Sequence, residues 1–287
     1  MNTELIRATT EDKLILTGLL YVPATSSKKL VLHIHGMGGN FFANRFLDFI
    51  SEELTSKGWA FLAPNTRGND AITDIPVAGP DEKYERIGSY RELFEDCIKD
   101  IKTWIDLAES RGYTEIVLQG HSLGAVKAAY YIAKTQDNRV SKLVFMSPPD
   151  MVGLLEADKA HDANLKDAKQ MMKDGRETDI MPGIIWDFYY LSPRTFLNFS
   201  QRGNDIDVFN TYDKKKSSDT LGNITIPVLS ITGGKDDANI YTANESMNVI
   251  KQKTNKSPKF DIRVIDRAPH SYFKHEQELA SSISAWI

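Results

Sequence analysis

Short apolar runs recur along this chain, and they constrain its fold more than any other feature. Most of the runs are continuous rather than alternating, as in strands that are buried on both faces of a parallel sheet. Helix-like segments separate them, which implies right-handed crossovers and an α/β sandwich of three layers. The predicted strands are Leu30–Ile34, Trp59–Ala63, Ile116–Leu118, Leu143–Met146, Val228–Ile231 and the more mixed Phe260–Ile265.

The remaining patterns complete this α/β prediction. Glu4–Thr9 and Leu14–Tyr21 flank Glu11 and Asp12 at the start of the chain, and they predict an antiparallel hairpin. The predicted helices lie between the later strands and after the last one. They are Ala43–Lys57, Arg91–Arg111, Ala125–Thr135, Ala243–Lys253 and Glu276–Ile287.

Residues 148–223 interrupt the alternation of strands and helices. This segment has no convincing strand but is rich in aromatic residues, including the run WDFYY at 186–190. A structureless loop of this length is unusual in a compact domain. We therefore predict a mostly helical cap over the sheet, with its clearest helix at 157–173. Residues 1–147 and 224–287 then form the core domain.

The composition excludes several classes of protein. The chain has 287 residues, 41% of them hydrophobic, and a formal net charge of -4, with no strong cluster of Lys and Arg. No apolar run approaches the roughly 20 residues that cross a bilayer, and the pattern of the first residues leads us to expect no signal peptide. The one cysteine, Cys97, lies in a helical pattern and is expected to be buried. We expect a cytoplasmic protein without nucleic-acid or membrane partners, and the sequence does not indicate its oligomeric state.

The sequence GHSLG, residues 120–124, places Ser122 between a predicted strand and a predicted helix. G-x-S-x-G in this context is typical of a nucleophilic serine on a strained turn, because larger side chains at the glycine positions would collide with the neighbouring backbone. The helix N-terminus would favour negative charge developing near the serine. The alternative is a serine that simply caps the helix.

A glycine-rich loop, HIHGMGGN at 33–40, follows the first parallel strand. Its spacing does not fit the phosphate-binding patterns of nucleotide sites. An oxyanion hole fits better, because acyl transfer uses one backbone donor from such a loop and one from the residue after the nucleophile. The predicted donors are the N–H groups of Met37 and Leu123.

A nucleophilic serine needs a general base, and His270 is the candidate. It stands in APHSYF, immediately after the last predicted strand and before the final helix, where it can reach Ser122. The other histidines occupy positions that favour structural or surface roles. They are His33, His35, His121, His161 and His275.

The orienting acid is predicted in TGGKDD, residues 232–237, after the strand Val228–Ile231. Asp236 is favoured over Asp237 because it lies three residues after Gly233. Asp150, after the preceding strand, is a more distant alternative. The acid would fix the His270 tautomer and stabilise the imidazolium.

In this order, HGMGGN, NTRGND (65–70), GHSLG, GGKDD and APHSYF resemble the α/β-hydrolase superfamily with its Ser-His-Asp triad. The resemblance covers about residues 14–287 without most of the insertion, and it implies a mostly parallel sheet flanked by helices. LTGLLYVPA, HIHGMGGNFFANRF and NTRGND are more narrowly similar to the branch that includes siderophore-hydrolysing esterases.

The motifs together predict a serine hydrolase of carboxylic esters that needs no metal and no organic cofactor. Trp186 and Tyr190 are predicted to form an apolar wall for acyl or aryl groups, or else to anchor the insertion to the sheet. A thioesterase, an amidase or an acyltransferase would use the same triad. A non-catalytic binding protein on a hydrolase scaffold is the alternative from another class.

Overall fold

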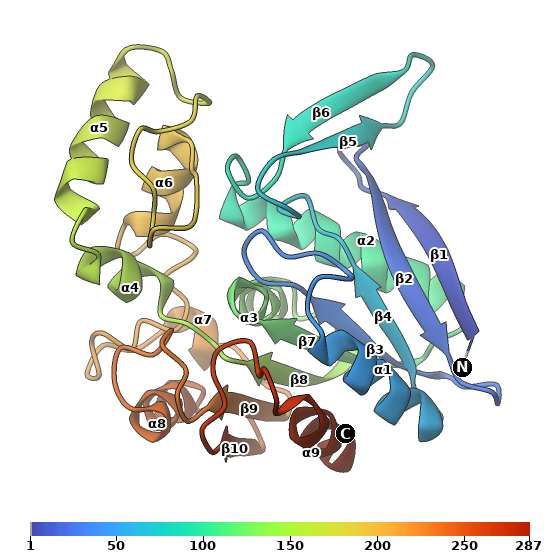
Figure 1. Ribbon diagram of the computed structural model, residues 1–287. Helices are drawn as coiled ribbons and strands as arrows, with labels where there is room; N and C mark the ends of the chain where they lie inside the picture. The colour runs from blue at the N-terminus through green and yellow to red at the C-terminus, as the bar shows by residue number, and fades with distance from the viewer. Residues whose placement is uncertain (1) are drawn as a thin grey trace.

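The computed structural model describes residues 2–287, and its centre is an eight-stranded sheet. The strands are β1 (Asn2–Thr9), β2 (Ile15–Val22), β3 (Lys29–Ile34), β4 (Ala60–Pro64), β7 (Glu115–His121), β8 (Val140–Met146), β9 (Val228–Gly233) and β10 (Phe260–Ile265). Their order is β1-β2-β4-β3-β7-β8-β9-β10 (Figure 1). β1 pairs antiparallel with β2, and β2 with β4, while all other pairs are parallel. The predicted hairpin and the six predicted later strands are confirmed.

Helices cover both faces of the sheet, as predicted. One apolar cluster joins the sheet to α1 (Phe46–Ser56) and α9 (Glu276–Trp286). The other joins it to α2 (Cys97–Ser110), α3 (Leu123–Thr135) and α8 (Ala243–Lys253). A 3-10 turn, Phe94–Asp96, leads into α2. α1, α2, α8 and α9 each bury one stripe because their apolar residues recur with the helical period, whereas α3 is buried nearly all round. The three-layer α/β class is therefore confirmed.

The register of the parallel strands brings their carboxyl ends to one edge. Ile34 pairs with Gly120, His121 with Met146, and Met146 with Ile231. Loops that follow neighbouring parallel strands therefore emerge side by side, as is typical of ligand sites in α/β proteins. The glycine-rich loop, the serine turn and the loops after β9 and β10 all leave from this edge.

Residues 148–223 hold four helices: α4 (Met151–Ala157), α5 (His161–Lys173), α6 (Pro193–Ser200) and α7 (Asp219–Gly222). α4, α5 and α6 lie together at one side of the sheet (Figure 1). The prediction of one helix over 157–173 was wrong in its first turn. Asp158 is extended, with φ -66° and ψ 130°, and its carboxylate accepts the N–H groups of Ala160 and Trp186. The bond to Ala160 is local and competes with helix continuation, while the bond to Trp186 ties this break to a segment 28 residues away.

A two-stranded hairpin, β5 (Thr73–Val77) and β6 (Lys83–Ile87), was not predicted. It extends away from the main sheet (Figure 1). Most of its residues are exposed, so it lacks the apolar run by which the other strands were recognised. An ion pair between Arg86 and Asp74, 2.8 Å apart, joins the two strands.

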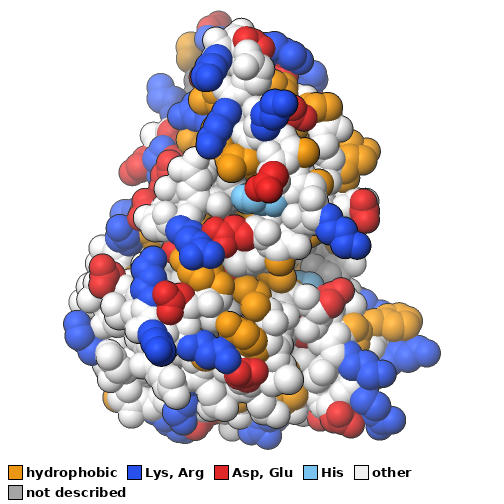
Figure 2. Space-filling model, turned by 90° about the vertical axis from the view of Figure 1, so that its left-hand side faces the viewer, with side chains coloured by type: hydrophobic (Ala, Val, Ile, Leu, Met, Phe, Trp, Pro, Cys, Tyr) orange, Lys and Arg blue, Asp and Glu red, His pale blue; other side chains and the backbone are white. Residues whose placement is uncertain are grey.

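The surface of the described chain mixes charges of both signs. On the face that carries α5 and α8, basic and acidic side chains are interspersed (Figure 2). Among residues 2–287, no helix has the length and apolar character that a membrane crossing requires. Cys97 is buried, as predicted.

Candidate active site

Ser122 lies at the junction of β7 and α3 in a strained backbone conformation. Its φ is 55° and its ψ is -128°, values that non-glycine residues rarely adopt. Its hydroxyl makes no capping hydrogen bond with α3, so the alternative of a simple helix cap is not supported. Strain of about 1–3 kcal/mol at such a residue persists only where the surrounding structure imposes it, and it is concentrated at functional sites.

Three glycines make this turn sterically possible. A Cβ atom on Gly120 would lie 2.1 Å from the carbonyl oxygen of Gly124, and one on Gly124 would lie 2.1 Å from that of Ile34. A Cβ on Gly36 would lie 2.9 Å from Cβ of Ser122. The serine turn and the glycine-rich loop after β3 are therefore in direct contact, which no larger residue at these positions would permit.

The glycine-rich loop presents Met37 beside the serine. Met37 lines the same cavity as Ser122, and its N–H donates no hydrogen bond within residues 2–287. Leu123 is the first residue of α3, so its N–H has no intrahelical partner. Both N–H groups are therefore free to donate to a ligand, as an oxyanion hole requires.

His35 stabilises this loop through hydrogen bonds of both its ring nitrogens. Its Nε2 accepts the N–H of Thr66 at 3.0 Å, so its Nδ1 carries the proton and donates to the Gly36 carbonyl at 2.8 Å. Burial lowers the pKa of His35 to about 4. The ring is therefore neutral at pH 7, and it fixes the backbone immediately before Met37.

The segment NTRGND, residues 65–70, supports the loop from its other side. Asp70 accepts a hydrogen bond from the Asn40 amide at 2.8 Å. Arg67 is itself anchored by Asp100, whose buried carboxylate lies 2.8 Å from the guanidinium. The resemblance noted in the sequence therefore corresponds to a bracing role for this segment, which its residue types alone did not reveal.

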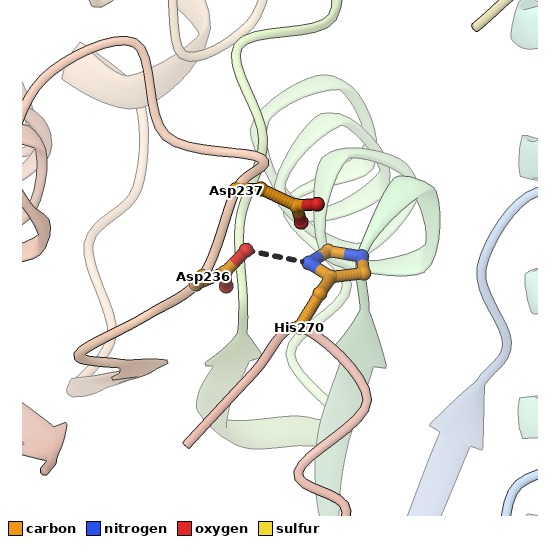
Figure 3. A group of neighbouring side chains, drawn as sticks. All are labelled: Asp236, Asp237 and His270. Carbon is orange, nitrogen blue, oxygen red and sulfur yellow. Dashed lines mark hydrogen bonds and ion pairs between the residues drawn. The ribbon is translucent and has the colours of Figure 1, made fainter. Parts of the chain in front are cut away.

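His270 lies in the loop after β10, and Asp236 lies in the loop after β9. His270 Nδ1 and Asp236 Oδ1 are 2.8 Å apart (Figure 3). The Asp236 side chain is only 1% exposed, whereas that of His270 is 28% exposed. The bond leaves Nε2 of His270 free for proton transfer. This is the pairing predicted for base and acid.

The surroundings of Asp236 favour its ionised form. Its carboxylate also accepts hydrogen bonds from the Thr232 hydroxyl and the Ala238 N–H, both at 3.0 Å. Burial alone would raise the pKa of Asp236, but the bonds and the charge of His270 outweigh it and hold the pKa at about 2. Asp236 is therefore a permanent anion at physiological pH.

Asp150, the alternative acid, has a different structural position. It caps α4 by accepting the Gly153 N–H at 2.9 Å, and it also accepts the Thr211 hydroxyl and the Tyr212 N–H. It makes no bond with His270 among the described residues. Its contacts hold α4 against the loop before α7, which is a structural role.

Asp237 lies beside the pair on the cavity side. Its carboxylate and the ligand atoms of Asp236 and His270 lie within 4.8 Å of one another (Figure 3). Two carboxylates and an imidazole are donors that Zn²⁺ accepts, so these are the described residues that could hold a metal. The hydrogen bond from His270 to Asp236 accounts for their placement without one.

A cavity of about 330 Å³ lies beside the candidate catalytic residues. Ser122 and His270 both line it, although no hydrogen bond joins their side chains in the described structure. Unliganded active sites often show long catalytic contacts of this kind. Most of the lining is apolar. The other lining residues are Met37, Pro149, Met151, Leu154, Trp186, Phe188, Tyr189, Asp237 and Ala238.

The predicted aromatic wall is only partly where the sequence placed it. Trp186 lines the cavity, but Tyr190 does not and is 45% exposed. A tight turn closed by the bridge between Ile185 and Tyr189 turns Phe188 and Tyr189 to the cavity instead. Tyr190 lies just after this turn and outside the cavity lining.

The remaining histidines lie outside the cavity lining. His121 Nε2 donates a hydrogen bond to the His270 carbonyl at 2.9 Å. His33 is buried in β3 and contacts the Gln119 amide at 2.9 Å. His161 begins α5, and His275 precedes α9.

A family model described as the alpha/beta hydrolase fold matches residues 29–276. The chain belongs to the α/β-hydrolase family. No curated protein sequence matches this α/β hydrolase.

Solved structures of esterases share the fold of this α/β hydrolase. An esterase from Pyrococcus furiosus has a TM-score of 0.64 at 18% identity, over 99% of this chain and 90% of that one. Est1E from Butyrivibrio proteoclasticus, with ferulic acid bound, has a TM-score of 0.65 at 18% identity, over 97% and 96%. An esterase domain from Rhodothermus marinus has a TM-score of 0.62 at 14% identity, over 100% and 98%. At these identities the likeness establishes the fold.

Three buried histidines predict that this α/β hydrolase loses stability in mild acid. Burial lowers the pKa of His121 to about 3, that of His35 to about 4, and that of His33 well below its usual value. Below pH 6.5 the unfolded chain therefore binds protons that the folded chain does not. The free energy of unfolding then decreases as the pH is lowered. Between pH 6.5 and 5.0 we expect a loss of about 1.5 kcal/mol for each histidine.

Urea denaturation at several pH values measures this effect. The slope of the unfolding free energy against pH should correspond to the uptake of nearly three protons on unfolding. His121→Asn should reduce this uptake by about one proton. A free energy of unfolding that stays constant from pH 6.5 to 5.0 would show that these histidines are not held neutral.

Proposed function

We propose that this α/β hydrolase cleaves carboxylic esters through Ser122, His270 and Asp236. The observation that carries the proposal is the strained turn of Ser122, which has no cap bond with α3 and opens on the cavity that His270 also lines. A backbone strained at a residue with a free hydroxyl supports a nucleophile rather than a structural serine. The fold alone would not support an activity, because it carries many.

In the proposed reaction, Ser122 Oγ attacks the ester carbonyl while His270 Nε2 accepts its proton. The N–H groups of Met37 and Leu123 stabilise the oxyanion. His270 then passes the proton to the leaving alcohol, and the acyl group remains on Ser122. A water molecule, deprotonated by the same nitrogen, attacks the acyl-enzyme and releases the acid. Asp236 keeps the Nδ1 proton in place throughout.

The cavity supports substrates of small or medium size. Its volume of about 330 Å³ is at the lower end of the range for small-molecule sites, and its wall is mostly apolar. Ferulic acid, bound in the structurally similar Est1E, is an aryl acid of this kind. We therefore propose that the substrates of this chain are esters of small acyl or aryl acids. The narrower resemblance to siderophore-hydrolysing esterases stays a prediction.

A matched set of substrates tests the choice of bond. Phenyl butyrate, its thioester and its anilide differ only in the atom that leaves, so one assay of butyrate release compares the three. We expect kcat/KM to be highest for the oxygen ester. Higher values for the thioester or the anilide would assign the chain to thioesterases or amidases instead.

Acyl transfer is tested in the same assay. Adding methanol or hydroxylamine at increasing concentration should divert only a minor part of the butyrate from free acid. Preferential formation of the new ester or hydroxamate at low acceptor concentration would identify an acyltransferase. If the wild-type chain binds the three substrates but turns over none of them, the non-catalytic alternative would be favoured.

A further inference from the structure

Asp237 is a charged group in the cavity that the proposed reaction does not use. It lines the cavity together with Ser122 and His270, and no Lys or Arg does so within residues 2–287. Its carboxylate makes no hydrogen bond or ion pair with another described residue, in contrast to that of Asp236. The cavity therefore contains one uncompensated negative charge close to the reacting groups.

An aromatic corner lies on the wall of the same cavity. The rings of Trp186 and Tyr189 are 6.1 Å apart at 83°, and those of Phe188 and Tyr189 are 4.9 Å apart at 82°. Near-perpendicular rings offer both faces and edges to one ligand. The face of an aromatic ring attracts a cation, most of all an ammonium group that has lost its water.

The position of this corner is fixed by a strained turn. Trp186 and Asp187 both have positive φ, 52° and 58°, although neither is glycine. The bridge between Ile185 and Tyr189 and the bond from the Trp186 N–H to Asp158 hold the turn in place. Strain at a turn that lines a cavity is typical of a ligand clamp.

We propose that Asp237 sets the preference of the site for the charge of its substrate. With the aromatic corner, it makes the site prefer esters that carry an ammonium group near the scissile bond over neutral esters, and neutral esters over those that carry a carboxylate there. This inference rests on the proposed esterase function, and it names the substrate class of that site.

Physical considerations set the scale of the preference. Asp237 is exposed at the edge of the cavity, so its attraction for a charge within about 5 Å is that of a surface pair rather than of a buried one. An effect of about tenfold on kcat/KM for each charged substrate follows from this. Salt should weaken the preference, because the group is accessible to counterions.

Matched esters test the proposal by ratios. Butyrylcholine and 3,3-dimethylbutyl butyrate have the same shape and differ by the positive charge of the alcohol. Mono-p-nitrophenyl glutarate and p-nitrophenyl valerate differ by a terminal carboxylate on the acyl part. For the wild-type chain we expect a kcat/KM ratio of about ten for the first pair and about one tenth for the second.

Asp237→Asn should bring both ratios to within about twofold of one. Because each ratio compares two substrates of one variant, a general change in the reactivity of His270 cancels. Asp266→Asn, a change at an aspartate that is 88% exposed and outside the cavity lining, is the matched control and should keep the wild-type ratios. Ratios that are the same in Asp237→Asn and the wild type would overturn the proposal.

A binding measurement separates this proposal from the esterase function. Calorimetric titration of Ser122→Ala with butyrylcholine and with 3,3-dimethylbutyl butyrate reports charge preference without turnover. Tighter binding of the choline ester, by about tenfold and lost on adding Asp237→Asn, supports the role of Asp237 even if no ester is cleaved. Equal binding of the two esters contradicts it, whatever the activity of the wild type.

Discussion

Ser122→Ala is expected to lower kcat for short p-nitrophenyl esters by at least about 10⁴-fold. The strained turn exposes the hydroxyl to the cavity, and no other serine lines that cavity among the described residues. The change removes one oxygen atom that makes no capping bond, so the fold should not suffer. Initial rates, measured at enzyme concentrations high enough to detect the residual activity, give the comparison.

Two controls belong to this experiment. Ser110→Ala changes an exposed serine at the end of α2 and should keep the wild-type kcat. Thermal unfolding of Ser122→Ala should match that of the wild type, because alanine keeps the Cβ atom and the backbone conformation and loses only a hydroxyl that makes no capping bond. A folded Ser122→Ala chain with kcat within tenfold of the wild type would exclude Ser122 as the nucleophile.

Asp236→Asn is expected to lower kcat by about 10⁴-fold while KM changes little. The carboxylate accepts the Nδ1 proton of His270 at 2.8 Å, and its pKa of about 2 keeps it anionic. An amide of the same shape can offer an N–H to Nδ1, which favours the wrong tautomer and removes the charge that stabilises the imidazolium. Asp237 cannot compensate, because it makes no hydrogen bond with His270.

The comparison of acids makes this prediction specific. Asp150→Asn should lower the unfolding temperature, because three donors lose a charged acceptor, but the folded variant should keep kcat within a few fold. Equal losses of kcat in Asp236→Asn and Asp150→Asn would mean that the acid has not been identified. Circular dichroism of each variant distinguishes lost chemistry from lost fold.

Most of the fold could be predicted from the sequence, and the candidate site could be proposed from it, because both depend on local signals. Buried parallel strands are continuous apolar runs, and the residues that follow them emerge at one edge whatever the loops contain. Ser122, His270 and Asp236 each come shortly after such a strand. The preference for Asp236 over Asp237 also depended on local spacing, and the bond to His270 agrees with it.

The features that escaped prediction leave no apolar pattern in the sequence, and some of them depend on contacts between distant segments. Whether Tyr189 or Tyr190 faces the cavity is decided by a turn that Asp158 and Ile185 hold in place. The break between α4 and α5 depends on the same aspartate. The polar hairpin β5–β6 has no apolar run to mark it. The unpaired charge of Asp237 became visible only when the other residues of the cavity were known.

Covalent labelling tests the central claim most directly. Diethyl p-nitrophenyl phosphate should release one equivalent of nitrophenol per chain, and mass spectrometry of the digested protein should find one diethylphosphoryl group, on Ser122. His270→Gln should slow the reaction by several orders of magnitude, and Ser122→Ala should prevent it. An adduct on another residue, or equal labelling of Ser122→Ala, would contradict the assignment of Ser122 as the nucleophile.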